Sequence, residues 1–307
     1  MSLHGVLVVD KPAGPTSHDI VDRVRRALGE RRVGHTGTLD PFATGVLAVC
    51  VGKATRLVRF LSSGDKVYRA RARLGFATTT DDLLGTPLGP ARPVPRDREA
   101  VAAAARGLTG TLSQLPPVFS AKHVGGRRSH ELAREGRDVA RTPTVVTVHR
   151  FDVLGLEGDE VEFDVRCAPG TYVRALARDL GEALGCGAHL IALRRLRSGA
   201  FGLDRAVAGD RLDASAAPAL VPMEELLTDL PEVRVGPDGA RALRHGRDLG
   251  QALVISGFPD TAPPRVRVVG SDGSLLALAV PRGFGPAIPG LPLEPVLHPD
   301  LVLSDTE

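Results

Sequence analysis

The chain has 307 residues, of which 43% are hydrophobic and 24% are charged. A chain of this length and apolar content can bury a sizeable core, which excludes disorder throughout. The net charge is only +3, yet residues 1–75 hold 13 lysines and arginines against 6 acidic residues. A basic first quarter fits a polyanionic partner such as nucleic acid, and a solvated basic face fits it equally well.

The apolar stretches and the cysteines exclude further classes. No stretch approaches the roughly 20 apolar residues of a membrane-spanning helix, and the N-terminus has no basic leader with a cleavage site. We therefore expect a cytoplasmic protein. Cys50, Cys167 and Cys186 are odd in number and far apart, so they predict buried, unreactive thiols and no disulfide framework or CxxC metal site.

The first part of the chain predicts alternating strands and helices. "GVLVVDKP" is typical of a buried strand, and "TSHDIVDRVRRALGE" of a helix with a capping box from Thr16 to Asp19. An apolar strand, "VLAVCVG", and a short helix around "KATRLVRFL" follow. In "KVYRARARL" the alternation predicts a half-buried strand with Tyr68 at the start of its apolar face.

Later segments predict helices, a hairpin and a separate C-terminal part. "DREAVAAAARGL" favours a helix, residues 143–167 a two-stranded hairpin, and "GTYVRALARDLGEALG" a helix with Arg174 off its apolar stripe. "AHLIALRRLRSGAF" is interpreted as a second, more basic helix. After Pro231, short apolar runs between turn signals predict a small β-rich domain.

"RRVGHTGTLDPFATGVLAVCVG" places one carboxylate, Asp40, in a glycine-rich loop. Glycines at 34, 37 and 45 permit positive φ, and Pro41 favours an extended Asp40, leaving room beside the carboxylate for a flat ligand. Asp40 could equally cap a turn, as aspartate before proline often does.

Three common functions of a glycine-rich loop do not fit the residues found here. A phosphate-binding loop would continue into a helix through Lys-Ser or Lys-Thr, whereas an apolar strand follows here. A metal site would need more ligands than the nearby His35, and an acid–base pair would need a second carboxylate. A lone aspartate acting as nucleophile or base remains, and it needs a cationic neighbour. Arg174 is a candidate, although spacing alone cannot bring it there.

Several blocks in order resemble one family. "GVLVVDKPAGPTS", "GHTGTLDPFATGVL", "DKVYRARARLG", "QLPPVFSA", "ELAREG" and "GTYVRALARDLGEALGCGAHLIALRRLRSGAF" resemble the TruB family of bacterial tRNA pseudouridine synthases and cover nearly all of residues 5–205. The resemblance implies that a T-arm uridine, at tRNA position 55, is detached from its ribose, rotated and rejoined through carbon 5. It implies no cofactor and no metal.

The resemblance also implies roles for individual residues. Asp40 matches the catalytic aspartate, as nucleophile or as base, and Arg174 matches the arginine that pairs with it, so we predict this pairing. Tyr68 matches the tyrosine that stacks on the base and helps remove the carbon 5 proton, although a core aromatic also fits its strand. The substrate-binding residues implied are His35, Lys11, Leu193 and Tyr172.

The predicted architecture is α+β. We expect a pseudouridine-synthase-like catalytic domain with a mixed, largely antiparallel sheet over residues 1–230, including an RNA-clamping insertion near 75–150. A PUA-like RNA-binding domain is expected over 231–307, contacting the tRNA acceptor stem. We expect a monomer that binds tRNA, with no membrane and no obligatory protein partner. The alternatives are a tRNA-folding chaperone, with or without catalysis, and pseudouridylation of another RNA.

Arginines on the first helix and in 194–197 are expected to hold phosphates, or to form a solvated face. The sequence departs from the family at three positions. Thr79 stands where an aspartate is frequent, so a role for that carboxylate cannot be transferred. His123 and His130 replace a lysine and a tyrosine, which leaves the tRNA contacts of their loop open.

Overall fold

The computed structural model describes residues 3–118, 123–124, 127–128, 141–284 and 294–303. The chain forms two compact units. The larger unit comprises Leu7–Val49 and Val58–Ala219, and the smaller comprises Met1–Val6, Cys50–Leu57 and Leu220–Glu307. The predicted division into residues 1–230 and 231–307 stays a prediction.

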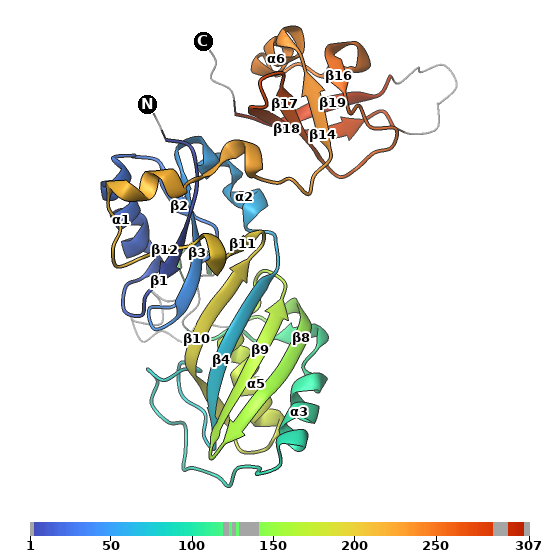
Figure 1. The fold of residues 1–307 in the computed structure, drawn as a ribbon. Helices are drawn as coiled ribbons and strands as arrows, with labels where there is room; N and C mark the ends of the chain where they lie inside the picture. The colour runs from blue at the N-terminus through green and yellow to red at the C-terminus, as the bar shows by residue number, and fades with distance from the viewer. Residues whose placement is uncertain (1–2, 119–122, 125–126, 129–140, 285–293, 304–307) are drawn as a thin grey trace. The chain divides into compact units, whose positions relative to one another are not determined.

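The larger unit is built on one mixed sheet (Figure 1). Its strands in spatial order are β12 (Val207–Ala208), β1 (Gly5–Lys11), β3 (Thr44–Val51), β10 (Ala188–Ser198), β4 (Lys66–Leu74), β9 (Glu160–Cys167), β8 (Thr144–Glu157) and β5 (Gly110–Gln114). Strand β4 pairs antiparallel with β9 and β10, whereas β10 pairs parallel with β3. The expected mixed, largely antiparallel sheet is therefore confirmed, and so is the hairpin of β8 and β9.

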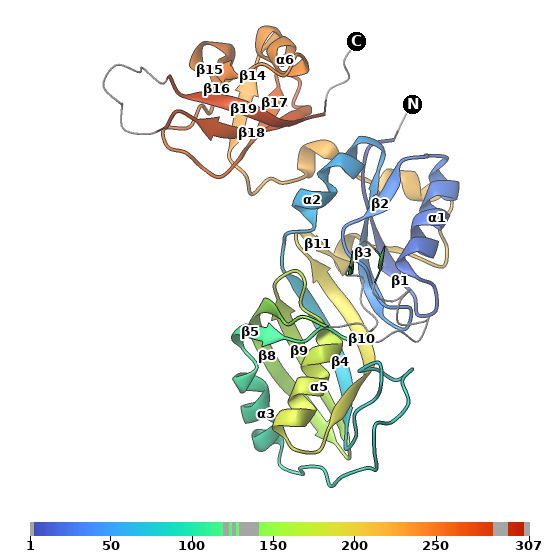
Figure 2. The same cartoon turned by 180° about the vertical axis from the view of Figure 1, so that it is seen from behind.

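Helix α5 (Val173–Ala183) lies against one face of β4, β9 and β10, with α3 (Arg98–Gly107) beside it near β8 (Figure 2). The apolar stripe of α5 is buried in a core shared with these strands, as the spacing of Val173, Leu176 and Leu180 predicts. Tyr68 and alternate residues of β4 face this core, while the arginines between them face solvent. The sheet therefore has a covered face and an open face.

Helix α1 (Ser17–Leu28) begins at the predicted capping box, in which Thr16 and Asp19 exchange side-chain and backbone hydrogen bonds. The helix ends at Gly29, whose left-handed φ of 62° is favourable for glycine. The short helix expected around "KATRLVRFL" is a 3₁₀ turn, η1 (Gly52–Leu57), followed by α2 (Val58–Leu61). Smaller elements of the larger unit are β2 (Val33–His35), β6 (His123–Val124), β7 (Arg127–Arg128), β11 (Phe201–Gly202), η2 (Leu203–Arg205) and η3 (Ala214–Ala219).

One predicted helix is wrong: "AHLIALRRLRS" forms the central strand β10. Its pairing with β4 shifts register between Leu190 and Ala192, and again between Arg195 and Arg197. The first bulge moves the buried positions from Leu190 to Leu193, a spacing of three residues. Buried apolar residues three apart are typical of a helix, so the bulge explains the incorrect interpretation.

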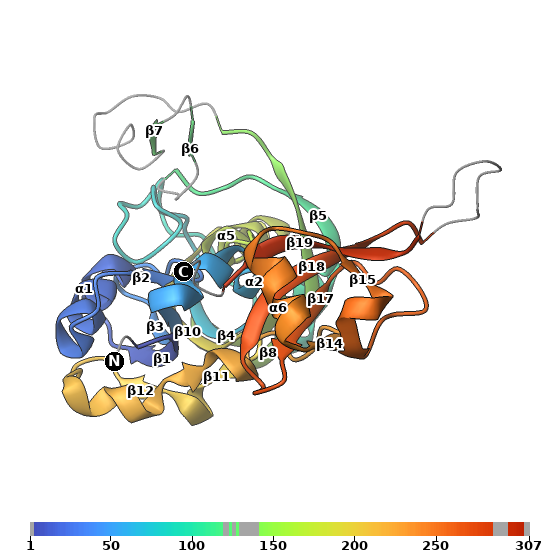
Figure 3. The same ribbon diagram turned by 90° about the horizontal axis from the view of Figure 1, so that it is seen from above.

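The smaller unit contains the predicted β-rich C-terminal part (Figure 3). Its sheet runs β15 (Leu249–Gly250), β19 (Val296–Val302), β18 (Leu275–Arg282), β17 (Val266–Gly270), β14 (Glu232–Val235) and β16 (Val254–Ser256). Helix α6 (Pro237–Arg244) contributes Ala242 and Leu243 to the core of this sheet. The remaining elements are β13 (Val221–Pro222), η4 (Met223–Glu225) and η5 (Gln251–Leu253).

The cysteines and the helices of the described residues agree with the predictions made from the sequence. Cys50, Cys167 and Cys186 are free and buried, as predicted. Burial raises the pKa of the Cys50 thiol to about 12 and that of Cys167 to about 11, so both stay protonated near neutral pH. Among the described residues, no helix has the length and apolar character needed to cross a membrane.

Candidate active site

The glycine-rich loop lies between β2 and β3 and turns at Asp40, whose carbonyl accepts a hydrogen bond from the Ala43 N–H at 3.1 Å. Of the three glycines expected to permit positive φ, only Gly45 uses it, with a φ of 99°. A Cβ atom on Gly45 would lie 2.2 Å from the carbonyl oxygen of Arg195. This glycine therefore allows β3 to run close beside β10, and the loop is held in place there.

The predicted pairing of Asp40 with Arg174 is present. The Arg174 Nε lies 3.0 Å from Oδ2 of Asp40, and Nη2 donates to Oδ1 at 3.1 Å. The guanidinium therefore binds the carboxylate through two parallel contacts, the arrangement that restricts its orientation most. The Arg174 side chain is 6% exposed and that of Asp40 is 30% exposed, so the carboxylate keeps an open edge.

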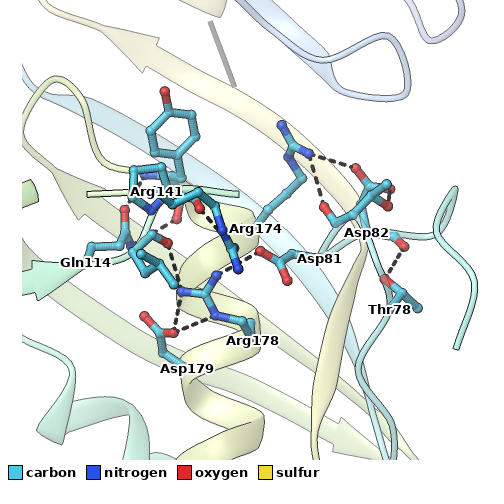
Figure 4. Close-up of polar contacts among 12 residues, drawn as sticks. Thr78, Asp81, Asp82, Gln114, Arg141, Arg174, Arg178 and Asp179 are labelled. Carbon is cyan, nitrogen blue, oxygen red and sulfur yellow. Dashed lines mark hydrogen bonds and ion pairs between the residues drawn. The ribbon is translucent and has the colours of Figure 1, made fainter. Parts of the chain in front are cut away.

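The opposite edge of Arg174 holds a second carboxylate that sequence reasoning missed. Its Nη1 donates to the Asp82 carboxylate at 3.2 Å and to the Thr80 carbonyl at 3.1 Å (Figure 4). Asp82 is itself oriented, because Oδ1 accepts from the Thr80 hydroxyl at 2.6 Å and from the Leu84 N–H at 3.0 Å. Arg174 therefore lies between two carboxylates and is fixed by both.

The neighbouring arginine of α5 repeats this arrangement one turn along the helix. Arg178 pairs with Asp81 at 2.9 Å and with Asp179 at 2.7 Å, and donates to the Leu115 carbonyl at 2.9 Å (Figure 4). The two consecutive aspartates in "TTTDD" therefore form ion pairs with two arginines that lie four residues apart on α5. That pair of patterns, DD in a loop and RxxxR on a helix, is the sequence signal that could have predicted this network.

Lys11 and Ser17 hold the backbone on both sides of Asp40. The buried Lys11 ammonium donates to the carbonyls of Ala43 at 2.7 Å, Pro12 at 2.9 Å and Pro41 at 3.1 Å. The Ser17 hydroxyl donates to the Leu39 carbonyl at 3.1 Å and accepts from the Leu39 N–H at 2.8 Å. Lys11 therefore supports the backbone of the Asp40 loop, whereas its predicted role in substrate binding stays a prediction.

Opposing effects act on the ionisation of the Asp40 carboxyl. Burial is the largest and raises its pKa, and the Asp82 carboxylate acts in the same direction. The charges of Arg174 and Lys11 lower it, so they offset part of the cost of ionising Asp40. Burial also lowers the pKa of the Lys11 ammonium to about 8, although Asp40 opposes that change.

Tyr68 and Leu193 lie in the same core cluster as Leu39, the residue before Asp40. Both side chains are 8% exposed. Burial raises the pKa of the Tyr68 phenol, and the Asp40 carboxylate contributes a smaller effect in the same direction. The position of Tyr68 is thus compatible with both interpretations, as a core aromatic and as a residue of the Asp40 site.

His35 and Tyr172 are the remaining residues expected to bind substrate. The half-buried His35 ring accepts a hydrogen bond from the Gly37 N–H at 3.2 Å, and burial lowers its pKa to about 4, so it is neutral near pH 7. Tyr172 precedes α5, and its backbone exchanges two hydrogen bonds with the Gln114 side chain, at 2.9 and 3.2 Å. These contacts fix the Tyr172 backbone, and a substrate-binding role for its side chain stays a prediction.

The arginines expected to hold phosphates fall into different environments. Arg194 pairs with Asp10 at 2.6 Å and is 40% exposed, whereas Arg195 is 1% exposed and bonded to carbonyls. Arg195 therefore cannot reach a phosphate, and its assignment to the phosphate-binding set is wrong. The exposed Thr79 hydroxyl accepts from the Thr86 N–H at 3.1 Å. His130 lies outside the described residues, as does most of the loop around His123.

Two family profiles match consecutive parts of the chain. The profile described as "TruB family pseudouridylate synthase (N terminal domain)" matches residues 25–173, and "tRNA pseudouridylate synthase B C-terminal domain" matches residues 174–228. The tRNA pseudouridine synthase B of Thermobifida fusca is 46% identical over 288 residues, covering 91% of this chain and 94% of that protein. The protein of that name from Syntrophotalea carbinolica is 40% identical, covering 91% and 93%.

Two solved structures contain a chain with the same fold over nearly all of this one. A Cbf5-Nop10-Gar1 complex contains a chain that superimposes with a TM-score of 0.73 and 28% identity, covering 98% of this chain and 85% of that one. A chain of an H/ACA RNP bound to a substrate RNA containing 2'-deoxyuridine gives a TM-score of 0.72 and 26% identity over the same shares.

Proposed function

Because the chain belongs to the TruB family and is a tRNA pseudouridine synthase, we propose that Asp40 acts on a uridine of the tRNA T-arm. The observation that carries the proposal is the bidentate pair of Asp40 with the buried Arg174. Among the glycine-loop residues, Asp40 alone offers a carboxylate, and its partly exposed edge can meet a substrate.

The reaction needs one reactive carboxylate and a uracil held beside it. The bond between N1 of uracil and C1′ of ribose breaks, the base rotates, and a bond forms between C5 and C1′. C5 then loses its proton and N1 gains one, so the product is an isomer of the substrate. Asp40 acts either as a nucleophile or as a base toward the ribose; both roles require the ionised carboxylate, which Arg174 and Lys11 stabilise.

Tyr68 is proposed to stack on the extruded uracil and to assist removal of the C5 proton. Its burial in the same cluster as Leu193 and its electrostatic coupling to Asp40 support this role. Extruding a base from a folded RNA arm costs a few kcal/mol, which stacking on aromatic and apolar side chains can offset. His35, which is neutral near pH 7, is proposed to contact the RNA without contributing charge.

The remaining contacts to tRNA are assigned by position. We propose that exposed arginines near the N-terminus, such as Arg31 and Arg32, contact phosphates, and that residues 231–307 contact the acceptor stem. A cytoplasmic location is proposed in keeping with the tRNA substrate. The expected monomeric state and independence from protein partners stay predictions.

Mapping of pseudouridine on a full-length unmodified tRNA transcript tests the proposal. We expect the wild-type protein to modify one uridine in the T-arm, and to leave unmodified a control transcript with cytidine at that position. Modification confined to uridines outside the T-arm would refute the substrate assignment. Binding and refolding of the transcript without any modification would favour the chaperone alternative.

A further inference from the structure

Arg195 lies in the central strand of the larger unit and is its largest fully buried side chain, with 1% of its surface exposed. It lies on β10 directly opposite Tyr68 on β4, so both side chains project from the same face of the sheet. The close approach permitted by Gly45 occurs at the Arg195 backbone. Three parts of the site therefore meet at this residue.

The Arg195 guanidinium binds the backbone of the Asp40 loop. Nε donates to the Val46 carbonyl at 2.7 Å, Nη2 to the Gly37 carbonyl at 3.0 Å, and Nη1 to the Thr38 carbonyl at 3.5 Å. Two acceptors precede Asp40 and one follows it, so one rigid side chain spans the loop. Lys11 and Ser17 hold only the residues next to the turn.

This buried cation has no ion-pair partner among the described residues, whereas the other buried arginines there, Arg174 and Arg267, have two and one. Burying a guanidinium costs several kcal/mol, and arginine cannot avoid that cost by losing its proton. Its position is maintained by the carbonyls of the loop. An apolar residue would fill the same space without this cost, so the charge and the five N–H donors require an explanation beyond packing.

Arg195 also acts on Tyr68. Its charge and a side-chain hydrogen bond to the phenol both lower the pKa of Tyr68, opposing the larger effect of burial. The two residues are cross-strand partners on one face of the sheet, so the guanidinium lies beside the phenol. Arg195 thus binds the Asp40 loop and lies beside Tyr68, the two elements to which the chemistry has been assigned.

We propose that Arg195 is a positioning residue that holds the Asp40 loop and the Tyr68 hydroxyl in one reactive arrangement. The inference rests on the proposed roles of Asp40 and Tyr68. Lysine at this position retains the charge but presents a single nitrogen, which cannot span Gly37, Val46 and Tyr68 together. Methionine retains much of the volume and removes every donor.

The test compares Arg195→Lys and Arg195→Met with wild type, with Arg71→Lys as the matched control. Arg71 lies on the open face of β4, is 55% exposed and pairs with Glu160. We expect the single-turnover rate of pseudouridine formation to fall roughly 100-fold in Arg195→Met and roughly tenfold in Arg195→Lys, because small displacements of reacting groups have effects of this size. The tRNA dissociation constant should stay within about threefold of wild type, since a 1% exposed side chain does not touch the RNA.

A second measurement reports Tyr68 directly. The chain contains two tyrosines and no tryptophan, so protein labelled with 3-fluorotyrosine gives two fluorine resonances, which Tyr172→Phe assigns. In both Arg195 variants we expect the Tyr68 resonance to move and its titration to shift to higher pH, because a hydrogen bond and a nearby cation are lost or displaced. The Tyr172 resonance, and both resonances in Arg71→Lys, should stay unchanged.

The outcomes separate positioning from simple stabilisation. Folded Arg195 variants with the wild-type rate overturn the inference, and so does a loss of rate that only follows the loss of folded protein in both variants. An unmoved Tyr68 resonance in folded Arg195→Lys overturns the contact with the phenol. Failure of the proposed function would look different, since the wild-type protein itself would then leave the T-arm uridine unmodified.

Discussion

Two bidentate arginine–aspartate pairs in the larger unit have nearly the same geometry and opposite surroundings. Arg174 contacts Asp40 at 3.0 and 3.1 Å on the covered face of the sheet, and Arg69 contacts Asp164 at 2.9 and 3.0 Å on the open face. The Arg174 side chain is 6% exposed and that of Arg69 is 50% exposed. Contact distances therefore do not distinguish the carboxylate proposed to react from a structural one, whereas the burial and the further partners of the arginine do.

The surroundings decide how much each charge matters. Water and salt screen the exposed pair, so its loss is easily tolerated. Around Asp40, burial raises the pKa of the carboxyl and the fixed cations oppose that rise, so the removal of Arg174 leaves a largely buried carboxylate with much less compensation. Substitutions in the two pairs should therefore have very different effects on the rate of the reaction.

Asp40→Asn should lower the single-turnover rate at least about 10³-fold, because the amide is neither a nucleophile nor a base. Binding of tRNA should be retained, since the amide has nearly the shape of the carboxylate. Asp164→Asn is the matched control and should stay within about twofold of wild type. Equal losses in the two variants would show that burial does not separate the two pairs.

Arg174→Gln should lower the rate roughly 100-fold at neutral pH, since it removes the groups that orient and stabilise the Asp40 carboxylate. It also leaves Asp82 without its guanidinium, so we expect a lower melting temperature. Rates measured well below the melting temperature separate the two effects. A variant that keeps the wild-type rate would show that the pairing is not required.

Asp82→Asn should have an intermediate effect, roughly tenfold on the rate, because Arg174 keeps Asp40 but loses the carboxylate on its other side. The Michaelis constant for tRNA should change little, since Asp82 is 4% exposed. Thr79→Asp gives a useful comparison, because Thr79 is exposed and contacts Thr86 only through loop hydrogen bonds. A larger effect at Thr79 than at Asp82 would contradict this assignment.

Arg69→Ala should have the smallest effect, less than about twofold on the rate and a change in melting temperature of at most about 2 °C. The side chain is half exposed and its partner remains solvated. Activity and thermal denaturation measured side by side with Arg174→Gln check the comparison directly. A loss as large as that of Arg174→Gln would mean that the open face also contributes to the reaction.

Local patterns predicted much of the fold because short-range forces determine it. The capping box at Thr16, the alternation around Tyr68 and the stripe of α5 each follow from hydrogen bonds or periods within one element. Strand β10 was missed because its register shifts depend on pairing with its neighbour β4, which no local period reveals. The incorrect helix therefore arises from a tertiary effect.

Some residues of the candidate site could likewise be predicted from the sequence, whereas others could not. Asp40 stands out in the sequence as a lone carboxylate, and the family resemblance pointed to its partner 134 positions away. Asp82 and Arg195 were missed as parts of the site, because only the folded chain shows what their side chains contact. A basic segment such as "LRRLR" suggested exposed arginines, whereas alternation along β10 places Arg194 toward solvent and buries Arg195.

The acid limb of the pH–rate profile tests the central claim most directly, namely that Arg174 keeps Asp40 ionised in a buried site. Burial raises the pKa of Asp40, so the rate should fall as the pH drops through that raised value; Arg174 lowers it, so removing the guanidinium should move the limb upward. We expect single-turnover rates of Arg174→Gln to show a limb at higher pH than wild type, with partial recovery of the rate in alkali. A uniformly lower rate with the wild-type limb would contradict the claim.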